Sequence, residues 1–223
     1  MKVIKGFNYI RKHGVLAFIK TCYYRQAPIN YFYDKYYNVN TTGYVFSKDL
    51  GLVGFENCDY RPIPFRHLLK VLNTIPLEKN QCTFLDYGCG KGRALICAST
   101  YPFKKIIGVE LSRDLLNLAQ KNIDNMRHAQ TKNTELIQCD AQLFAISDDI
   151  NVIYFFNPFV GTILENVVKN IHSSFQKTPR KIFIIFFNNS EFDRIVKNQD
   201  WLKKIVQKNF CKSIYYGLYE TII

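Results

Sequence analysis

Apolar and polar positions follow two alternating periods along the chain from about residue 63 onward. Short continuous apolar runs predict buried strands, and longer stretches whose apolar residues recur every three or four positions predict amphipathic helices. The predicted strands are 83–86, 105–109, 134–138, 152–156 and 181–187. The predicted helices are 63–75, 91–101, 112–127 and 161–173, and Ser112 is suited to cap the third of them.

The C-terminal stretch, residues 201–223, predicts two further strands that are joined near Asn209–Lys212. Strands that alternate with helices of this length are typical of a mostly parallel sheet covered on both faces. We therefore expect an α/β fold with a doubly wound, mostly parallel seven-strand sheet and an antiparallel C-terminal edge. This domain would span residues 59–223 and follow a helical N-terminal arm, residues 1–58.

Composition adds few constraints to this picture. The chain has 223 residues, 48% of them apolar, which is enough for one domain and an extension. Its seven cysteines show no CxxC spacing, which favours reduced thiols over a zinc site or a disulfide framework. The N-terminal apolar run, interrupted by Lys5, Arg11 and Lys12, is too short for a signal peptide or a membrane span. We expect a soluble cytoplasmic protein with no membrane insertion and no bound metal.

The positive charge is concentrated in the arm. The chain has a net charge of +12, and residues 1–47 carry seven Lys and Arg residues against one acid, Asp34. The same stretch holds an aromatic cluster that runs from Tyr23 to Tyr37. Basic residues interleaved with aromatic rings can bind nucleic acid. The alternative, which we favour, is an arm that packs its rings on the main domain and points its lysines to solvent.

The stretch FLDYGCGKGR, residues 84–93, ends the first predicted strand in a glycine-rich turn. Ligands of doubly wound sheets bind at the carboxyl ends of the strands, near the switch point. The loop lacks the GxxxxGK[ST] pattern of a P-loop, and Arg93 occupies the third glycine position of a dinucleotide fingerprint. A tight strand-to-helix turn without a ligand is the alternative.

Three acids narrow the choice of ligand. Asp86, two residues before Gly88, would repel a pyrophosphate but attract a positively charged ligand. S-adenosylmethionine carries a sulfonium and an ammonium group and no phosphate. Glu110 follows Gly88 by 22 residues, close to the spacing of a carboxylate that binds ribose hydroxyls. Asp140 follows the third strand and could accept a hydrogen bond from an adenine amino group. Acids at the carboxyl ends of three successive strands favour a cofactor site.

These motifs resemble those of the class I S-adenosylmethionine-dependent methyltransferases. DYGCGKGR, GVE, CDA and FFNPF look like the first four motifs of that family, over residues 82–187. The resemblance implies S-adenosyl-L-methionine as cofactor and S-adenosyl-L-homocysteine as product. It implies a cofactor site made of Asp86, Gly88, Gly90, Lys91, Glu110, Asp140, Ala141 and Asn157. In this site Asp86 would lie near the methionine amino group, and the two glycine backbones would approach the cofactor. Lys91 and Arg93 would contact the cofactor carboxylate or face solvent.

A narrower resemblance concerns the methyl acceptor. The GKGR loop, GVELS, FNPF and the upstream YRP (60–62) are similar to a group of small bacterial methyltransferases, distant relatives of the disruptor-of-silencing type of histone-lysine methyltransferases. This favours N-methylation of a protein amine, lysine. The alternatives are a nucleic-acid base, a small molecule, or a non-catalytic module that binds cofactor or nucleic acid.

The FFNPF segment, residues 155–159, supplies the candidate catalytic residues. Methyl transfer is an in-line displacement at carbon, so the enzyme mainly positions the nucleophile. The Asn157 side-chain oxygen could accept a hydrogen bond from an attacking amino group, beside Pro158. Phe159 could stack on a planar substrate or line a channel around a lysine stem. The alternative is an Asn-Pro pair that only ends a strand in a turn. Family members that methylate amines often have NPPY or NPPF, and this chain has one proline fewer.

The arm leads through VNTTG, residues 39–43, toward Tyr60, a further candidate catalytic residue that is close enough to the core in sequence to reach the cofactor site. We expect the arm to fold over the carboxyl ends of the strands and close the site as a lid. The four histidines, His13, His67, His128 and His172, lack a companion constellation and are expected to be surface or core residues. Cys89 is expected to serve packing in the loop rather than nucleophilic chemistry.

Overall fold

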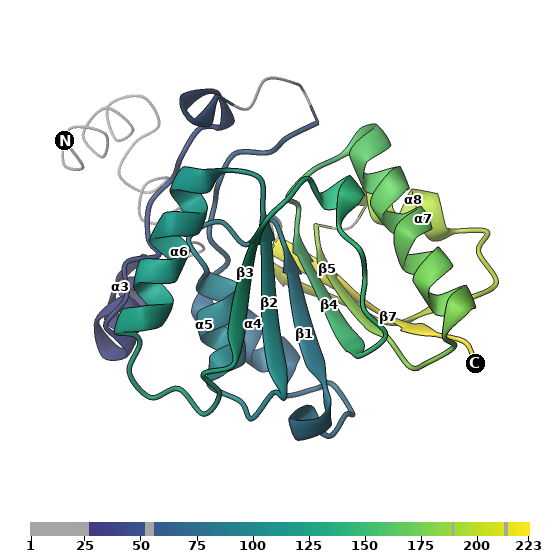
Figure 1. The fold of residues 1–223 in the computed structure, drawn as a ribbon, viewed down its shortest axis with the longest axis horizontal. Coiled ribbons are helices and arrows are strands. Elements are labelled where there is room, and N and C mark those ends of the chain that lie inside the picture. Colours follow the sequence, from purple (N-terminus) through teal and green to yellow (C-terminus); the bar gives the residue numbers. More distant parts are fainter. Residues whose placement is uncertain (1–26, 52–55, 189, 212–213) are drawn as a thin grey trace.

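The seven strands form one sheet in the order β3-β2-β1-β4-β5-β7-β6 (Figure 1). The computed structural model describes residues 27–51, 56–188, 190–211 and 214–223. The strands are β1 Thr83–Tyr87, β2 Lys105–Glu110, β3 Thr134–Gln138, β4 Ile150–Phe156, β5 Phe183–Phe187, β6 Leu202–Cys211 and β7 Ile214–Thr221. Strands β1 to β5 are parallel, whereas β7 runs antiparallel to both β5 and β6. The mostly parallel sheet with an antiparallel C-terminal edge is confirmed.

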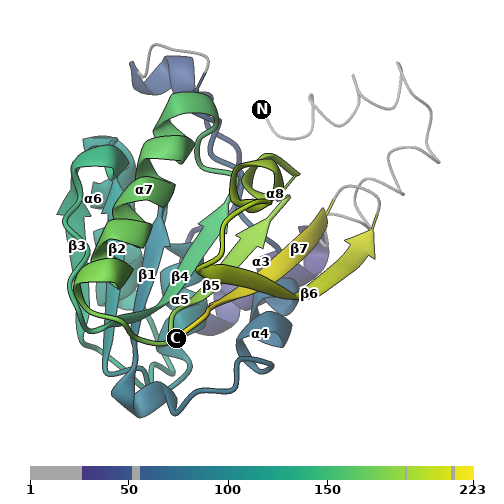
Figure 2. The same ribbon diagram turned by 90° about the vertical axis from the view of Figure 1, so that its right-hand side faces the viewer.

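The helices cover both faces of the sheet (Figures 1 and 2). They are α3 Ala27–Tyr37, α4 Phe65–Leu72, α5 Arg93–Ser99, α6 Arg113–Asn125, α7 Gly161–Lys177 and α8 Ser190–Val196, with short 3-10 turns η1 Ser47–Leu50, η2 Lys79–Gln81 and η3 Ala141–Leu143. The predicted N-cap of α6 is confirmed, since the Ser112 side chain accepts a hydrogen bond from the Leu115 amide. None of the helices in the described ranges is both long and apolar enough to cross a membrane. The cytoplasmic location stays a prediction.

Each strand contributes to two separate cores, one on each face of the sheet. Phe84 and Tyr154 pack on the face that α4 and α5 cover, whereas Tyr87 and Phe155 pack on the face that α7 and α8 cover. Every residue of β1 and β5 is buried, which explains why β5 is a continuous apolar run and why β1 is apolar apart from Thr83 and Asp86. The order of the strands places β1 beside β4, and their crossover helices leave on opposite faces. A ligand crevice is expected at the carboxyl ends of these two strands.

Helix α3 attaches the arm to the domain. The Tyr33 ring lies 5.1 Å from the Phe65 ring of α4, centre to centre, and Tyr37 packs against the same ring. On the other side of the helix Tyr31 and Phe32 are exposed, Phe32 by 64%. Some rings of the aromatic cluster thus pack on the domain, and others face solvent. Its residues before position 27 lie outside the described residues, as does His13. The domain boundary near residue 58 stays a prediction.

A buried ion pair joins α3 to the start of α5. The Arg93 guanidinium is 3.6 Å from the Asp34 carboxylate, and each side chain is almost completely buried. Thr41 connects them, because its hydroxyl donates to Asp34 at 2.6 Å and accepts from Arg93 Nε at 2.7 Å. Arg93 also donates to the Ile63 carbonyl at 3.0 Å. The expectation that Arg93 faces solvent is therefore wrong, since its charge is matched by the acid of the arm.

Candidate active site

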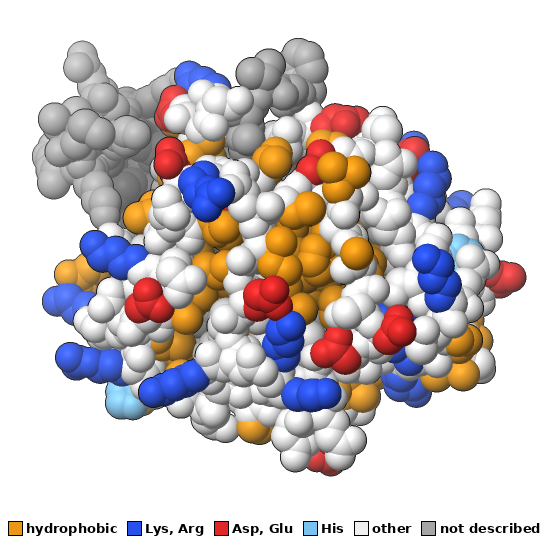
Figure 3. Space-filling model, in the orientation of Figure 1, with side chains coloured by type: hydrophobic (Ala, Val, Ile, Leu, Met, Phe, Trp, Pro, Cys, Tyr) orange, Lys and Arg blue, Asp and Glu red, His pale blue; other side chains and the backbone are white. Residues whose placement is uncertain are grey.

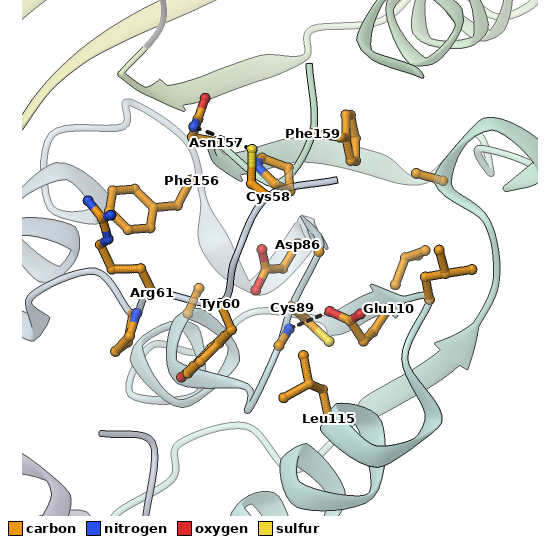
Figure 4. Close-up of a pocket in the computed structure, with 18 of the residues that line it drawn as sticks. Cys58, Tyr60, Arg61, Asp86, Cys89, Glu110, Leu115, Phe156, Asn157 and Phe159 are labelled. Carbon is orange, nitrogen blue, oxygen red and sulfur yellow. Dashed lines mark hydrogen bonds between the residues drawn. The ribbon is translucent and has the colours of Figure 1, made fainter. Parts of the chain in front are cut away.

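One cavity, which we name the main cavity because Asp86 and the glycine loop line it, lies at the carboxyl ends of β1, β2 and β4 (Figure 4). Its walls come from the glycine loop after β1, from Glu110, from the connection 157–159 after β4, and from residues 57–63. These segments are far apart in the sequence, and the parallel sheet brings them together. The position at the β1–β4 switch point is the one that the sequence predicts.

Asp86 is the acid at the centre of this cavity. It is 3% exposed, and its registered neighbours are Gly108 on β2 and Tyr154 on β4. Burial and, second, the nearby Glu110 carboxylate raise the pKa of Asp86 well above its usual value. No described residue donates a hydrogen bond that would offset the cost of burying this carboxylate. A buried carboxylate without a donor fits a positively charged ligand, and S-adenosylmethionine is such a ligand.

Glu110 fixes the glycine loop to the end of β2. One carboxylate oxygen accepts a hydrogen bond from the Gly90 amide at 2.9 Å, and the other accepts from the Ser112 amide at 2.9 Å. Burial raises the pKa of Glu110, although these backbone hydrogen bonds act in the opposite direction. Each oxygen keeps a lone pair, so the carboxylate can still accept from ribose hydroxyls.

The two glycines of the loop are required by protein contacts as well as by turn geometry. Gly88 and Gly90 have φ values of +72° and +55°, a region that side chains disfavour. A Cβ atom on Gly88 would lie 2.5 Å from the Pro158 side chain, and one on Gly90 would overlap the Tyr60 ring. Both glycines line the cavity, as the predicted cofactor contact requires. The space that a side chain would need at these two positions is filled by Pro158 and Tyr60.

Lys91 contacts the arm rather than the cavity. Its ammonium donates to the Thr42 carbonyl at 3.3 Å and lies over the Tyr60 ring, 5.2 Å from the centre. Among the described residues it does not line the main cavity, whereas the buried Arg93 does. The contact of Lys91 and Arg93 with the cofactor carboxylate stays a prediction.

At the end of β3, Ala141 lines the cavity but Asp140 does not, as far as the described residues show. The Asp140 carboxylate accepts a hydrogen bond from the Gln142 amide at 2.9 Å and caps η3. Cys139, which the sequence did not single out, lines the cavity in its place. The adenine contacts of Asp140 and Ala141 both stay predictions.

A short crossing segment, residues 56–61, passes over the carboxyl ends of β1 and β4. The Cys58 amide donates to the Pro158 carbonyl at 3.1 Å, and the Val160 amide donates to the Glu56 carbonyl at 3.0 Å. These two hydrogen bonds pair the crossing segment antiparallel with residues 158–160. The pairing places Tyr60 against the glycine loop. The Tyr60 hydroxyl then donates to the Thr41 carbonyl at 2.7 Å. The segment therefore lies where a lid would have to lie.

Asn157 lies between the main cavity and a second one. It follows the last residue of β4 and has a φ of +48°, and its side-chain amide nitrogen is 3.7 Å from the Cys58 sulfur. In Figure 4 its side-chain oxygen points away from Asp86. Asn157 lines both cavities, together with Cys58, Arg61 and Phe156. The second cavity has a volume of about 320 Å³, within the range of small-ligand sites.

Sequence reasoning missed several residues of the second cavity, chiefly Cys58, Asp59, Arg61, Phe156 and Asn188. Asn188 had a signal that could have found it. It follows two phenylalanines at the end of β5, as Asn157 follows two phenylalanines at the end of β4. Both asparagines adopt a positive φ. Because β4 and β5 are parallel neighbours, two strand-ending asparagines of this kind meet at one edge of the sheet.

Phe159 is a core residue in this structure. It is 5% exposed and packs edge-on against Tyr87 and Phe155, with ring centres 6.3 and 6.1 Å away. It lines the main cavity and not the second one, as far as the described residues go. Phe156, which lines both, is better placed to contact an acceptor. The substrate role of Phe159 stays a prediction.

The described histidines and Cys89 pack against neighbouring side chains. His67, His128 and His172 each stack on a neighbouring aromatic ring, with centres 4.1, 4.6 and 4.7 Å apart. Burial lowers the pKa of His67 to about 4, so this side chain is neutral at physiological pH. Cys89 is buried in the glycine loop, and burial raises the pKa of its thiol, which makes it a poor nucleophile.

A sheet of this order, with a glycine loop after β1 and buried acids after β1 and β2, defines the Rossmann-like methyltransferase fold. The methyltransferase-domain family matches residues 78–219, and the chain belongs to that family. It is an enzyme that transfers methyl groups from S-adenosylmethionine. The predicted class and cofactor are thereby confirmed, whereas the relation to the disruptor-of-silencing type stays a prediction.

Solved structures support the same fold. An RNA methyltransferase from Salinibacter ruber, in complex with S-adenosyl-L-homocysteine, is 16% identical with a TM-score of 0.52, covering 73% of this chain and 94% of that one. A SAM-dependent methyltransferase from Aquifex aeolicus is 15% identical with a TM-score of 0.55, covering 72% and 94%. A ribosomal protein L11 methylase from Lactobacillus delbrueckii subsp. bulgaricus is 14% identical with a TM-score of 0.51, covering 71% and 77%. No curated protein shows significant sequence similarity to the chain.

Proposed function

We propose that this enzyme methylates an amino nitrogen that is held in the second cavity, and that the acceptor is a protein lysine. The observation that carries the proposal is the position of Asn157, whose side chain lines both the main and the second cavity. An acceptor in the second cavity would meet the cofactor beside this amide. Phe156 and Tyr44 would contact the apolar stem of a lysine, and Asp59 would supply a negative charge at the same wall.

The residues of the main cavity would hold the cofactor by charge and by hydrogen bonds. Asp86 would balance its positive charge, and Glu110 would accept from its ribose hydroxyls. When bound, the cofactor would supply to the acceptor nitrogen a methyl carbon activated by a positively charged sulfur, the leaving group that keeps the electrons of the carbon–sulfur bond. The Asn157 oxygen would accept a hydrogen bond from the amino group and so orient its lone pair.

We propose that the arm acts as a lid through the crossing segment. A protonated lysine cannot attack, because its lone pair carries the proton. Exclusion of water disfavours the charged form of an amine and lowers its pKa. The backbone hydrogen bonds of Cys58 and Glu56 would keep the crossing segment over the site while the acceptor is bound.

A nucleic-acid base is the second candidate acceptor, and the polar lining of the second cavity favours it. Three asparagines, Asn57, Asn157 and Asn188, line this cavity beside Arg61 and Phe156. Amide and guanidinium groups recognise base edges, and aromatic rings stack on base faces. Transfer of a labelled methyl group into a cell lysate, followed by separation of protein, RNA, DNA and small molecules, would distinguish the two. Label recovered as methyl-lysine supports our proposal, whereas label in RNA or DNA overturns the choice of lysine.

The catalytic role of Asn157 is testable with Asn157→Gly. Glycine tolerates the positive φ, so the substitution removes the amide without straining the turn. We expect a loss of turnover of about 100-fold with nearly unchanged cofactor affinity, since orientation is lost only for the acceptor. Rates on the acceptor that the labelling experiment identifies would measure turnover, and calorimetry with S-adenosylhomocysteine would measure cofactor affinity. The matched control is Asn38→Gly, which also has a positive φ (+58°) but hydrogen-bonds to α6. If the turnover of Asn157→Gly stays within about two-fold of the wild type, Asn157 is a turn residue without a catalytic role.

A further inference from the structure

The hydroxyl of Tyr154 is buried without a partner. Tyr154 lies on β4, is 2% exposed and lines the main cavity. Among the described residues its hydroxyl has no hydrogen-bond donor or acceptor. Buried polar groups are nearly always hydrogen-bonded, so an unpartnered hydroxyl on a residue that lines a cavity is suited to bind a ligand. The functions proposed above make no use of it.

The sheet places the Tyr154 side chain on the same face as the acid of the site. Asp86 and Tyr154 are registered neighbours on parallel strands, so their side chains leave the sheet on the same face. The charged side chains that act on the Tyr154 hydroxyl are Asp86 and Arg93, and both line the same cavity. One wall therefore combines an acid that can only accept hydrogen bonds with a hydroxyl that can donate one.

Two cationic side chains of this region also donate within the protein, and Arg93 uses three of its five N–H groups in this way. The Lys91 ammonium donates to the arm at Thr42. Arg93 donates to Thr41, to the Ile63 carbonyl and to Thr42. An anionic group that enters this part of the cavity therefore meets the Tyr154 hydroxyl as a donor that no described residue occupies.

We propose that the Tyr154 hydroxyl binds the α-carboxylate of the cofactor's amino-acid end, beside Asp86, which takes the ammonium. This inference rests on the assignment of the main cavity to the cofactor. A hydroxyl donor complements a carboxylate, and a carboxylate complements an ammonium group. The pair recognises the two charges of an α-amino acid and makes Tyr154 a specificity-determining residue of the cofactor site.

The chain offers a matched control in Tyr87. Its hydroxyl is also buried without a partner among the described residues. Tyr87 lies on β1 in the core of the opposite face and does not line the cavity, as far as the described residues show. Tyr154→Phe and Tyr87→Phe each remove one unsatisfied oxygen and keep the ring in place. Neither should lower the melting temperature of the ligand-free enzyme, because no hydrogen bond is lost.

Calorimetry with three ligands tests the proposal on the full chain. S-adenosylhomocysteine has the whole amino-acid end, decarboxylated S-adenosylmethionine lacks the carboxylate, and methylthioadenosine lacks both charged groups. Tyr154→Phe should weaken S-adenosylhomocysteine binding by about 10-fold or more, as expected for a hydrogen bond to a charged group. It should leave the other two affinities unchanged, and Tyr87→Phe should leave all three unchanged.

Three outcomes would overturn the inference. Unchanged S-adenosylhomocysteine affinity in Tyr154→Phe would show that the hydroxyl does not bind the ligand. Equal weakening of all three ligands would show a general effect on the cavity rather than recognition of the carboxylate. Failure of the wild-type enzyme to bind S-adenosylhomocysteine would overturn the cofactor site itself, and this inference with it.

Discussion

At the scale of single residues, the site depends on two acids that the fold buries close together. Burial is the largest cause of the raised pKa of both Asp86 and Glu110, and Glu110 is the second cause for Asp86. In the ligand-free enzyme these carboxyl groups therefore keep their protons to a higher pH than free side chains do. A positively charged ligand reverses this preference, because it stabilises the carboxylate forms.

Cofactor binding should accordingly release protons. Affinity for S-adenosylmethionine should rise as the pH rises through the elevated pKa of Asp86 and level off above it. The stability of the ligand-free protein should change in the opposite direction, because a raised acid pKa favours the folded state at low pH and this contribution is lost as the pH rises through the folded pKa. Calorimetry in two buffers of different ionisation enthalpy measures the protons released. Asp86→Asn should bind less tightly and release fewer protons, whereas a pH-independent affinity of the wild type would contradict the assignment.

The sequence predicted the acids of the site better than their surroundings. Asp86 and Glu110 could be placed because the carboxyl ends of parallel strands meet at one edge of the sheet, so spacing along the chain is enough. The contact of Tyr60 with Gly90 could not be placed in this way. It depends on how a segment before the first strand folds back across the sheet, and no periodic pattern encodes that path.

At the scale of elements, α3 and α5 are joined by charge as well as by packing. The Asp34–Arg93 pair is buried, and the two threonines that follow α3 complete its hydrogen bonds. Removal of one partner from a buried pair leaves an uncompensated charge, which costs more than the pair itself contributes.

Arg93→Met should therefore destabilise the protein by about 3–5 kcal/mol, measured by urea unfolding. Asp34→Leu in the same chain should restore part of this loss, since no buried charge remains. The control is Arg194→Met, whose partner Glu191 lies one helical turn away at the surface, so its loss should cost at most about 0.5 kcal/mol. Equal effects of the two single substitutions would contradict a structural role for the buried pair.

Most elements were predictable because their burial imposes a clear period. The strands of the central sheet are covered on both faces, and α6 and α7 are long enough to repeat an apolar stripe. Helix α8 was missed because it has seven residues and buries only Phe192 and Val196. One pair of apolar positions does not establish a helical period.

At the scale of the whole molecule, the arm has two candidate roles that the structure separates in space. The crossing segment covers the site, whereas the exposed rings of Tyr31, Phe32 and Tyr36 lie with Lys35 on the outer side of α3. Lys and Arg side chains follow the flank that carries α3 and α6 (Figure 3). Closure of the site and recruitment of an anionic partner can therefore be tested with different substitutions.

We expect closure to dominate. Tyr60→Ala should lower turnover, because its ring packs on Gly90 and forms part of the cavity wall. Neutralisation of the basic residues at positions 2, 5, 11, 12 and 20, which lie outside the described residues, should leave acceptor binding and its salt dependence unchanged. Initial rates and binding at several salt concentrations would measure both effects. A flattened salt dependence in the neutralised variant would indicate recruitment of an anionic partner instead.

The order of the sheet also bears on how the protein stays apart from its own copies. Strand β6 is the last strand of the sheet, and among the described residues its ladder partner is β7. Such an edge is a template for strand addition and aggregation. Lys203, Lys204 and Lys208 lie exposed along this strand, and the first two form ion pairs with Glu220 and Asp193. A second copy that approached in register would bring these charges together, so β6 ends the sheet in a way that opposes fibril growth.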